Sequence, residues 1–212
     1  MSYNFITIEG CIGAGKTSLS SMLAAAYNAN LILEQFENNP FLPMFYEDKE
    51  RNAFAVELFF MAERFHHLKN LLSKSDLFKT FTISDFLFQK SLIFASQTLN
   101  ENEEKLYRSL FDIINTSLPK PDLIVYLYAP VEKLMQNIQK RGRSYELQIQ
   151  QSYLEQIQNA YLDYFKYQTN CPIVLLDTEN INFVENKDDF EFVKQILQAE
   201  HPIGITSIKK QT

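Results

Sequence analysis

The sequence is poor in residues that interrupt regular structure. Its 212 residues include five glycines and seven prolines. No tract is low in complexity, no segment repeats another, and no linker separates two domains. With 46% hydrophobic residues, the chain is long enough to bury a sizeable core. The sequence therefore predicts a single α/β domain over residues 1–212, with a peripheral tail at about 201–212.

Long apolar runs and basic runs are also missing. No apolar run approaches the roughly 18 residues of a membrane-spanning helix, and the first residues, MSYNF, lack the pattern of a signal peptide. The formal charge is −6 and no long basic run is present, which argues against a nucleic acid or a membrane surface as partner. We therefore expect a cytoplasmic protein whose partners are small molecules.

Cysteine is scarce as well. The chain has two cysteines, Cys11 and Cys171, which are too few for a disulfide framework and lack the spacing of a metal site. Cys11 lies within the glycine-containing loop described next. We interpret it as a small filler, or else as an oxidisable thiol that would obstruct the loop.

A phosphate-binding motif is present near the N-terminus. Residues 5–8 form a short apolar run of strand type, which leads into G-x-x-x-x-G-K-[ST]. Residues 18–29 have a helical pattern, so the motif has the strand–loop–helix context that it requires. Glycines let backbone N–H groups converge on phosphate, the helix adds its positive end, lysine neutralises charge, and threonine ligates Mg²⁺. We predict a triphosphate site formed by Gly10, Cys11, Ile12, Gly13, Ala14, Gly15, Lys16, Thr17 and Ser18.

Strand and helix patterns alternate along the rest of the chain. Apolar runs predict further strands at residues 31–33, 80–85, 122–128 and 171–177. Residues 37–52, which contain Pro40 and Pro43, are expected to be a loop or a broken helix. Helical patterns separate the strands. Five buried strands with helical crossovers predict an α/β fold, namely a doubly wound five-stranded parallel sheet with helices on both faces.

Polar residues follow three strands of this predicted sheet. Ligands of parallel sheets bind at the carboxyl ends of strands, where Gly10, Glu34 and Asp85 are found here. Glu34 fits either a general base that takes the proton of a hydroxyl nucleophile or a solvated residue. Asp85 fits either a ligand of Mg²⁺, directly or through water, or a helix N-cap. We expect these three strand ends to share one crevice.

Two arginines mark a candidate lid at about residues 139–150. Arg141 and Arg143 lie in the segment RGRSYE, and a guanidinium offers planar, multidentate contacts to phosphate. They fit a catalytic role in clamping the transferring phosphates, together with Lys16. Cations are also favourable at an ordinary helix C-terminus, so a solvated helix end is the alternative.

Several segments, taken together and in order, resemble the deoxynucleoside kinases, particularly their bacterial purine-type branch. They are GCIGAGKTSL, Glu34, NPFLPMFYED, VELFFMAERF, SDFLFQKSLIFA and RGRSYE, and the resemblance runs from about residue 4 to residue 185. It implies a fold of the P-loop kinase type, Mg²⁺ with ATP as phosphate donor, and a homodimer. It also implies ATP-dependent phosphorylation of the 5′-hydroxyl of a 2′-deoxynucleoside in nucleotide salvage.

The resemblance also implies roles for single residues. Glu34 would deprotonate the 5′-hydroxyl. Tyr46 and Glu146 would hold the 3′-hydroxyl, and Tyr46 would close the space where a ribose 2′-hydroxyl would sit. Glu57 and Arg64, which are seven residues apart and so on one helical face, would meet the edge of the base. Without the family, Tyr46 is an aromatic staple, and the other two are a solvated pair.

The chain departs from the family pattern in two places. Many members have an arginine after the acidic residue of the third strand, but here Phe86 follows Asp85, so Arg143 or another cation must substitute. Glu57 stands where the family commonly has glutamine. Because an ionised carboxylate only accepts hydrogen bonds, we expect purine deoxynucleosides to be preferred. The alternative functions are a thymidylate-type nucleoside-monophosphate kinase and a non-catalytic nucleotide-binding regulator.

Overall fold

The computed structural model describes residues 2–35, 39–73, 79–168 and 170–211. In this part of the chain, six strands form one sheet in the order β2-β3-β1-β4-β5-β6, and all neighbours are parallel. The strands are β1 (Phe5–Gly10), β2 (Asn30–Ile32), β3 (Thr82–Ser84), β4 (Leu123–Tyr128), β5 (Pro172–Asp177) and β6 (Gly204–Lys209). The predicted α/β fold with a parallel sheet is confirmed.

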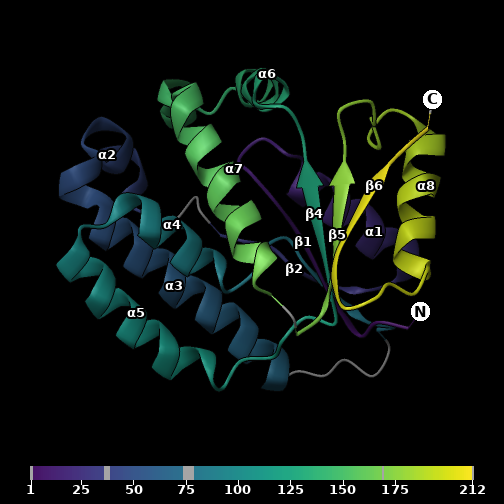
Figure 1. The fold of residues 1–212 in the computed structure, drawn as a ribbon, viewed down its shortest axis with the longest axis horizontal. Helices are drawn as coiled ribbons and strands as arrows, with labels where there is room; N and C mark the ends of the chain where they lie inside the picture. The colour runs from purple at the N-terminus through teal and green to yellow at the C-terminus, as the bar shows by residue number, and fades with distance from the viewer. Residues whose placement is uncertain (1, 36–38, 74–78, 169, 212) are drawn as a thin grey trace.

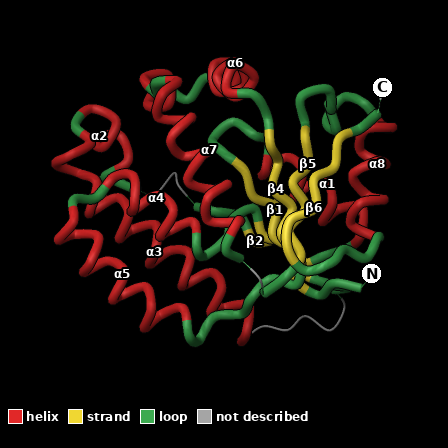
Figure 2. Tube along the Cα trace, in the orientation of Figure 1, coloured by secondary structure: helices red, strands yellow, loops and turns green. Residues whose placement is uncertain are grey.

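Helices cover both faces of the sheet (Figures 1 and 2). They are α1 (Lys16–Tyr27), α2 (Leu42–Glu47), α3 (Lys49–Ser73), α4 (Lys90–Thr98), α5 (Glu101–Asn115), α6 (Val131–Arg141), α7 (Gln151–Lys166) and α8 (Lys187–Gln198), with a short 3₁₀ helix, η1 (Ser144–Gln148). α1 and α8 lie side by side, where Gln198 donates to the hydroxyl of Tyr27 (2.9 Å). α7 covers the opposite face, where Tyr161 packs on Tyr126 of β4 (centroids 5.1 Å apart). This layout is doubly wound.

The burial of the central strands β1 and β4 explains why their apolar runs were clear in the sequence. All six residues of β1 are buried, as are five of the six in β4. Strands covered on both faces need nearly continuous apolar or β-branched side chains, which is the pattern of LIVYLY in β4. Two polar exceptions pair with each other: the hydroxyls of Thr7 and Ser84 lie 2.9 Å apart between β1 and β3.

The sheet has six strands, not the five predicted. β6 lies in the tail after His201, for which the sequence predicted no regular structure, and it pairs with β5 from Pro172↔Gly204 to Asp177↔Lys209. The prediction missed it because β6 is an edge strand whose residues alternate between partly buried and exposed. Such a strand does not need the apolar run that marks a central one.

Residues 37–52 contain more helix than expected. They hold α2 and the first residues of α3, while residues 37 and 38 lie outside the described part. Pro43 lies in the first turn of α2, where a missing N–H removes no helical hydrogen bond. Pro43 is therefore compatible with this helix, which begins one residue earlier, at Leu42. Even α3, with 25 residues, is not apolar enough to span a membrane, and the same is true of the other described helices.

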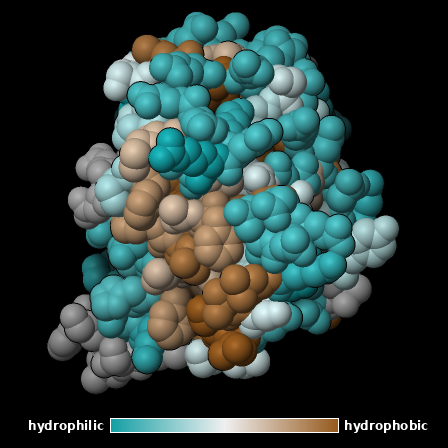
Figure 3. Space-filling view, turned by 90° about the vertical axis from the view of Figure 1, so that its left-hand side faces the viewer, coloured by the Kyte–Doolittle hydropathy of each residue, from teal (hydrophilic) through white to brown (hydrophobic). Residues whose placement is uncertain are grey.

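One side of the molecule carries an apolar surface. Figure 3 shows apolar side chains gathered on the side that faces left in Figure 1, where α2, α3 and α5 lie. Leu106 and Ile113 of α5 are 54% and 72% exposed. They are seven residues apart, so they lie on one face of the helix.

Candidate active site

The phosphate loop joins the carboxyl end of β1 to α1. Lys16 is the first residue of α1, and its ammonium donates to the carbonyl oxygens of Gly10 (2.8 Å) and Cys11 (3.0 Å). Burial lowers the pKa of Lys16. The lysine is thus held over the loop, where the oxygens of a bound phosphate would replace its carbonyl partners.

Two glycines of the loop are required by its shape. Gly13 has a φ of 84°, and a Cβ there would lie 2.7 Å from the carbonyl oxygen of Leu134. Gly15 has a φ of 89°, and a Cβ there would lie 3.0 Å from the ring of Phe183. Side-chain-bearing residues rarely adopt this left-handed backbone. Asn137 of α6 also donates to the carbonyl oxygen of Gly13 (2.9 Å), so α6 fixes the loop.

Cys11 behaves as a filler. Its side chain is 1% exposed, and burial raises the pKa of its thiol to about 11. The reactive form of cysteine is the thiolate. A buried, protonated thiol is a poor target for oxidation, so the structure does not favour the alternative of an oxidisable blocking group.

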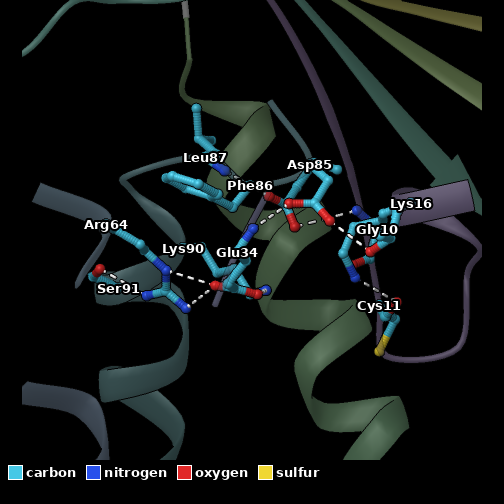
Figure 4. A network of polar contacts seen from close by, with 12 residues as sticks. Gly10, Cys11, Lys16, Glu34, Arg64, Asp85, Phe86, Leu87, Lys90 and Ser91 are labelled. Carbon is cyan, nitrogen blue, oxygen red and sulfur yellow. Dashed lines mark hydrogen bonds and ion pairs between the residues drawn. The ribbon is translucent and has the colours of Figure 1, made fainter. Parts of the chain in front are cut away.

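The carboxyl ends of three strands meet as expected (Figure 4). Asp85 directly follows β3, and its Oδ2 accepts a hydrogen bond from the Thr17 hydroxyl (2.5 Å). Its Oδ1 accepts one from the backbone N–H of Glu34 (2.6 Å). Burial raises the pKa of Asp85. Asp85 is not the N-cap of α4, because that helix begins at Lys90 after Gln89.

Thr17 and Asp85 form a chemically suitable site for Mg²⁺. A hydroxyl and a carboxylate are hard oxygen donors, and in kinases Mg²⁺ is usually bound by one or two such protein groups together with phosphate oxygens and water. The two side chains are in contact at the mouth of the phosphate loop. The residues present therefore fit the ion that the sequence predicted.

Glu34 lies between two cations (Figure 4). Its Oε1 accepts from Nε (2.8 Å) and Nη2 (2.6 Å) of Arg64, and its Oε2 accepts from Nζ of Lys90 (2.5 Å). Burial alone would raise the pKa of Glu34, but the charges of Lys90 and Arg64 outweigh burial and lower the pKa to about 2. The side chain is 14% exposed. Glu34 is therefore an ionised, enclosed carboxylate, and its interpretation as a solvated strand end is wrong.

A cavity between the sheet edge and helices α2, α3 and α4 brings the predicted substrate residues together. It is lined by all of them, namely Glu34, Tyr46, Glu57, Arg64, Asp85 and Glu146, and also by Lys16, Thr17, Arg141 and Arg143. The apolar part of its wall consists of Leu42, Phe45, Val56, Phe60 and Phe94. A cavity that combines an apolar wall with several charged groups fits a molecule with a flat ring and a polar reacting end.

A second cavity lies on the other side of the phosphate loop. It is lined by residues 13–18, by residues of α6, and by residues 181–185 before α8. Lys16, Thr17, Arg141 and Arg143 line both cavities. Two cavities that meet at a phosphate loop can hold a donor and an acceptor with their reacting groups in contact.

The predicted lid consists of the end of α6 and η1. Arg141 is the last residue of α6, and Gly142 turns the chain with a φ of 71°. Arg141 and Arg143 both form ion pairs with Glu146, the latter at 3.2 Å. The side chain of Glu146 is 7% exposed. These pairs direct the arginines to the cavities, which a solvated helix end does not explain.

Tyr46 connects the lid to α2. Its ring stacks on that of Tyr145 in η1, with centroids 6.1 Å apart and an interplanar angle of 18°. Burial raises the pKa of the Tyr46 hydroxyl, which therefore stays protonated and can donate a hydrogen bond. Tyr46 is thus both an aromatic staple and a polar group of the cavity.

Glu57 and Arg64 do not form the solvated pair considered from the sequence. They are 2% and 3% exposed, and Arg64 turns to Glu34 and to the Ser91 hydroxyl (2.8 Å). Glu57 instead accepts a hydrogen bond from Thr98 (3.1 Å). Burial raises the pKa of Glu57 to about 7, against the opposing charge of Arg64. The guanidinium is therefore directed at Glu34 and Ser91, and its charge helps to keep Glu34 ionised.

The protonation state of Glu57 corrects the expectation about base choice. With a pKa of about 7, a large fraction of the Glu57 side chains carries a proton at neutral pH in the ligand-free protein. A protonated carboxyl donates one hydrogen bond and accepts others, as glutamine does. A purely accepting carboxylate, from which the purine preference was predicted, therefore predominates only at higher pH.

Two buried charged residues of the site were missed from the sequence. Lys90 binds Glu34, as described above. Glu9 in β1 accepts hydrogen bonds from the Tyr161 hydroxyl (2.7 Å) and the backbone N–H of Leu87 (2.8 Å), which ties the segment after β3 to the phosphate loop. Both stand alone in apolar stretches, FITIEG and FLFQKSLIFA. A single charge in such a stretch is buried and needs a partner, so this signal was available.

Comparison with known proteins agrees with this geometry. Residues 6–200 match the family model described as deoxynucleoside kinase. The deoxyguanosine kinase of Bacillus subtilis (strain 168) is 37% identical over 194 residues, which cover 88% of this chain and 92% of that protein. The deoxyadenosine/deoxycytidine kinase of the same strain is 30% identical over 206 residues, covering 93% and 94%.

Solved structures support the fold. The structure of deoxyadenosine kinase from M. mycoides with bound dATP has a TM-score of 0.78 to this chain at 22% identity, covering 92% of this chain and 99% of that one. From the family match over residues 6–200 and the Bacillus relatives, the chain belongs to the deoxynucleoside kinase family and is a deoxynucleoside kinase.

Proposed function

We propose that this deoxynucleoside kinase transfers the γ-phosphoryl group of ATP to the 5′-hydroxyl of a 2′-deoxynucleoside and prefers purines. The observation that carries the proposal is the ionised carboxylate of Glu34, which lies where the apolar cavity meets the phosphate loop. It is linked to the loop through Asp85, which contacts both the Glu34 backbone and Thr17.

The donor would bind with its phosphates in the loop of residues 10–18 and its base in the second cavity. Backbone N–H groups and the start of α1 would hold the phosphates, with Lys16 neutralising their charge. Arg141 and Arg143 line both cavities and would clamp the transferring group. Thr17 and Asp85 would hold Mg²⁺, which supplies further neutralisation of phosphate charge when bound.

Glu34 would accept the hydrogen bond of the 5′-hydroxyl and direct its oxygen at the γ-phosphorus. As the new O–P bond forms, the bond from the γ-phosphorus to the β–γ bridging oxygen breaks, ADP leaves, and the hydroxyl proton passes to the carboxylate. Transition states of phosphoryl transfer are loose, so positioning contributes more than basicity. A carboxylate with a pKa of about 2 suits this role because it is ionised before the reaction and free to accept the proton.

The sugar would bind between α2 and the lid. The Tyr46 hydroxyl and the Glu146 carboxylate line the same cavity as Glu34, and we infer that they hold the 3′-hydroxyl as donor and acceptor. The Tyr46 ring, fixed by its stack on Tyr145, would occupy the space that a ribose 2′-hydroxyl requires. This accounts for a preference for deoxynucleosides over ribonucleosides.

The base would lie against the apolar wall and meet Glu57. A purine preference is supported by the names of the relatives, since the protein with 37% identity is a deoxyguanosine kinase. The relative with 30% identity is named for deoxyadenosine and deoxycytidine. Where Glu57 is ionised, thymine fits worst, because its single N–H lies between two carbonyl acceptors that would face the carboxylate. The donors of guanine and adenine suit an ionised Glu57, but cytosine also presents an amino donor, so the preference over deoxycytidine rests on the names of the relatives.

A nucleoside-monophosphate kinase of the thymidylate type is less compatible with this site. Its acceptor carries a phosphate, which would have to approach the negative charge of Glu34. Arg64 and Lys90 are both bound to that carboxylate. A neutral hydroxyl is the better acceptor here. The match to a family of kinases argues against a non-catalytic regulator.

A panel of the common deoxynucleosides and their monophosphates, assayed with Mg·ATP for ADP release and for 5′-phosphorylated product, tests the proposal. We expect turnover of purine deoxynucleosides, less of deoxycytidine and least of thymidine, with no saturation by monophosphates. Turnover of a monophosphate without turnover of any nucleoside would refute it.

We also infer that two copies of the chain associate through the apolar surface of α5. Leu106 and Ile113 are exposed on one face of that helix, and α5 lies on the side of the molecule where Figure 3 shows apolar side chains. A second copy would bury them. Light scattering of wild type should give the dimer mass, and Leu106→Glu with Ile113→Glu the monomer mass. Ile203→Glu, at another exposed isoleucine, should leave the dimer intact. A monomeric wild type would contradict this.

A further inference from the structure

Lys90 is a buried cation in an unfavourable position. It is the first residue of α4 and is 6% exposed. The first turn of a helix carries partial positive charge and disfavours cations, and burying an ammonium is costly. A charge in such a position needs a strong partner to compensate both costs.

That partner is Glu34. Nζ of Lys90 lies 2.5 Å from Oε2 of Glu34, and Arg64 binds the other carboxylate oxygen (Figure 4). The next residue of α4, Ser91, accepts a hydrogen bond from Arg64 (2.8 Å). The start of α4 therefore controls both oxygens of the carboxylate, one directly and one through the guanidinium.

The residues between Asp85 and Lys90 supply no positive charge. The first of them, Phe86, is 1% exposed within an apolar cluster that includes Phe88 and Phe111. The positive charge comes from four residues further along the chain, where Lys90 lines the same cavity as Glu34 and Lys16.

We propose that Lys90 is a positioning residue for phosphoryl transfer, which holds the Glu34 carboxylate toward the acceptor hydroxyl. The inference rests on the proposed function of Glu34. A carboxylate bound through one oxygen can rotate, whereas bonds to both oxygens from two helices fix its plane. A carboxylate has about four lone-pair sites, so these bonds leave sites for the hydroxyl.

Removing the ammonium of Lys90 should slow turnover without weakening the binding of the phosphate donor. We expect Lys90→Met to lower kcat by roughly 10- to 100-fold, the scale of a misplaced catalytic group, while the Kd of Mg·ATP changes by less than about twofold. Lys90→Arg, which keeps the charge, should recover most of the rate. The control is Lys105→Met, which removes an exposed lysine of α5 (71% exposed) and should behave as wild type.

A double-mutant cycle with Glu34→Gln identifies the partner through which Lys90 acts. If Lys90 acts through Glu34, adding Lys90→Met to Glu34→Gln should slow the enzyme little further. If the losses in kcat of the two single mutants multiply in the double mutant, the inference is overturned. It is also overturned if Lys90→Met has the wild-type kcat while Glu34→Gln is slow. A wild-type rate for Glu34→Gln would instead refute the proposed function itself, and this inference with it. If Lys90→Met does not fold, the comparison uses Lys90→Gln, which removes the charge, and Lys90→Arg, which keeps it. Equal kcat values for these two variants would overturn the inference.

Discussion

Glu57 offers a test of the site's electrostatics that needs no substrate. Its carboxyl group is 2% exposed, and burial raises its pKa from the ordinary 4.5 to about 7. Glu57→Gln replaces it with a neutral group of nearly the same shape, which removes the titration and keeps the hydrogen bond from Thr98. The comparison of the two proteins over pH therefore isolates one carboxyl group.

The sign and size of the effect follow from proton linkage. The folded state binds the proton more tightly, so the contribution of Glu57 to the free energy of unfolding is greatest below about pH 4.5, where both states are protonated. It decreases as the pH rises and levels off above the folded pKa of about 7. Each tenfold change in proton affinity is worth about 1.4 kcal/mol, so the whole loss is about 3 kcal/mol, a large part of a typical stability.

Urea unfolding of the ligand-free proteins between about pH 5 and pH 8 measures this loss. The free energy of unfolding of Glu57→Gln minus that of wild type should increase by about 2 to 3 kcal/mol over this range, mostly below pH 7. Other groups titrate equally in both proteins and cancel. Glu155→Gln, which changes an exposed residue of α7, should show no such trend. Parallel curves for wild type and Glu57→Gln would refute the assigned pKa and the corrected account of base reading.

Three further predictions concern the loop, the sugar and the base. Tyr46→Phe should weaken deoxynucleoside binding by about 1 kcal/mol, the value of one hydrogen bond, with little change in Tm; ribonucleosides that compete equally in wild type would contradict the steric role of the ring. Gly13→Ala should reduce Mg·ATP affinity measured by calorimetry, because its Cβ would lie 2.7 Å from a backbone oxygen, and unchanged affinity would contradict the steric constraint on the loop. At about pH 8 and above, where Glu57 of the wild type is ionised, Glu57→Gln should narrow the purine preference and raise the kcat/KM of deoxycytidine, by roughly 5- to 150-fold at most; an unchanged ranking of bases at that pH would remove Glu57 from base recognition.

That the three strand ends meet was predictable, because it depends on local sequence patterns and on one topological rule. The phosphate loop has a complete motif between a strand and a helix, and parallel strands bring their carboxyl ends to one edge. These two facts were enough to predict that Gly10, Glu34 and Asp85 meet. The contact between Asp85 and Thr17 (2.5 Å) follows from the same arrangement.

The partners of Glu34 were not predictable in this way. Arg64 lies 30 residues from Glu34 along the chain and Lys90 lies 56 residues from it, so their meeting depends on how α3 and α4 pack over the sheet. Helical spacing grouped Arg64 with Glu57 because both lie on one face of α3, but it carries no information about which carboxylate is ionised. The pKa values of about 2 and about 7 arise from burial and neighbouring charge, which only the folded arrangement provides.

The role of Glu34 in accepting the 5′-hydroxyl is tested most directly by the turnover rate of Glu34→Gln with deoxyguanosine and saturating Mg·ATP. The substitution keeps the size of the side chain and removes its charge. We predict a kcat lower by roughly 10²–10⁴-fold, with the Kd of Mg·ATP within about twofold of wild type. A kcat within about threefold of wild type would contradict the role of Glu34 and the mechanism built on it.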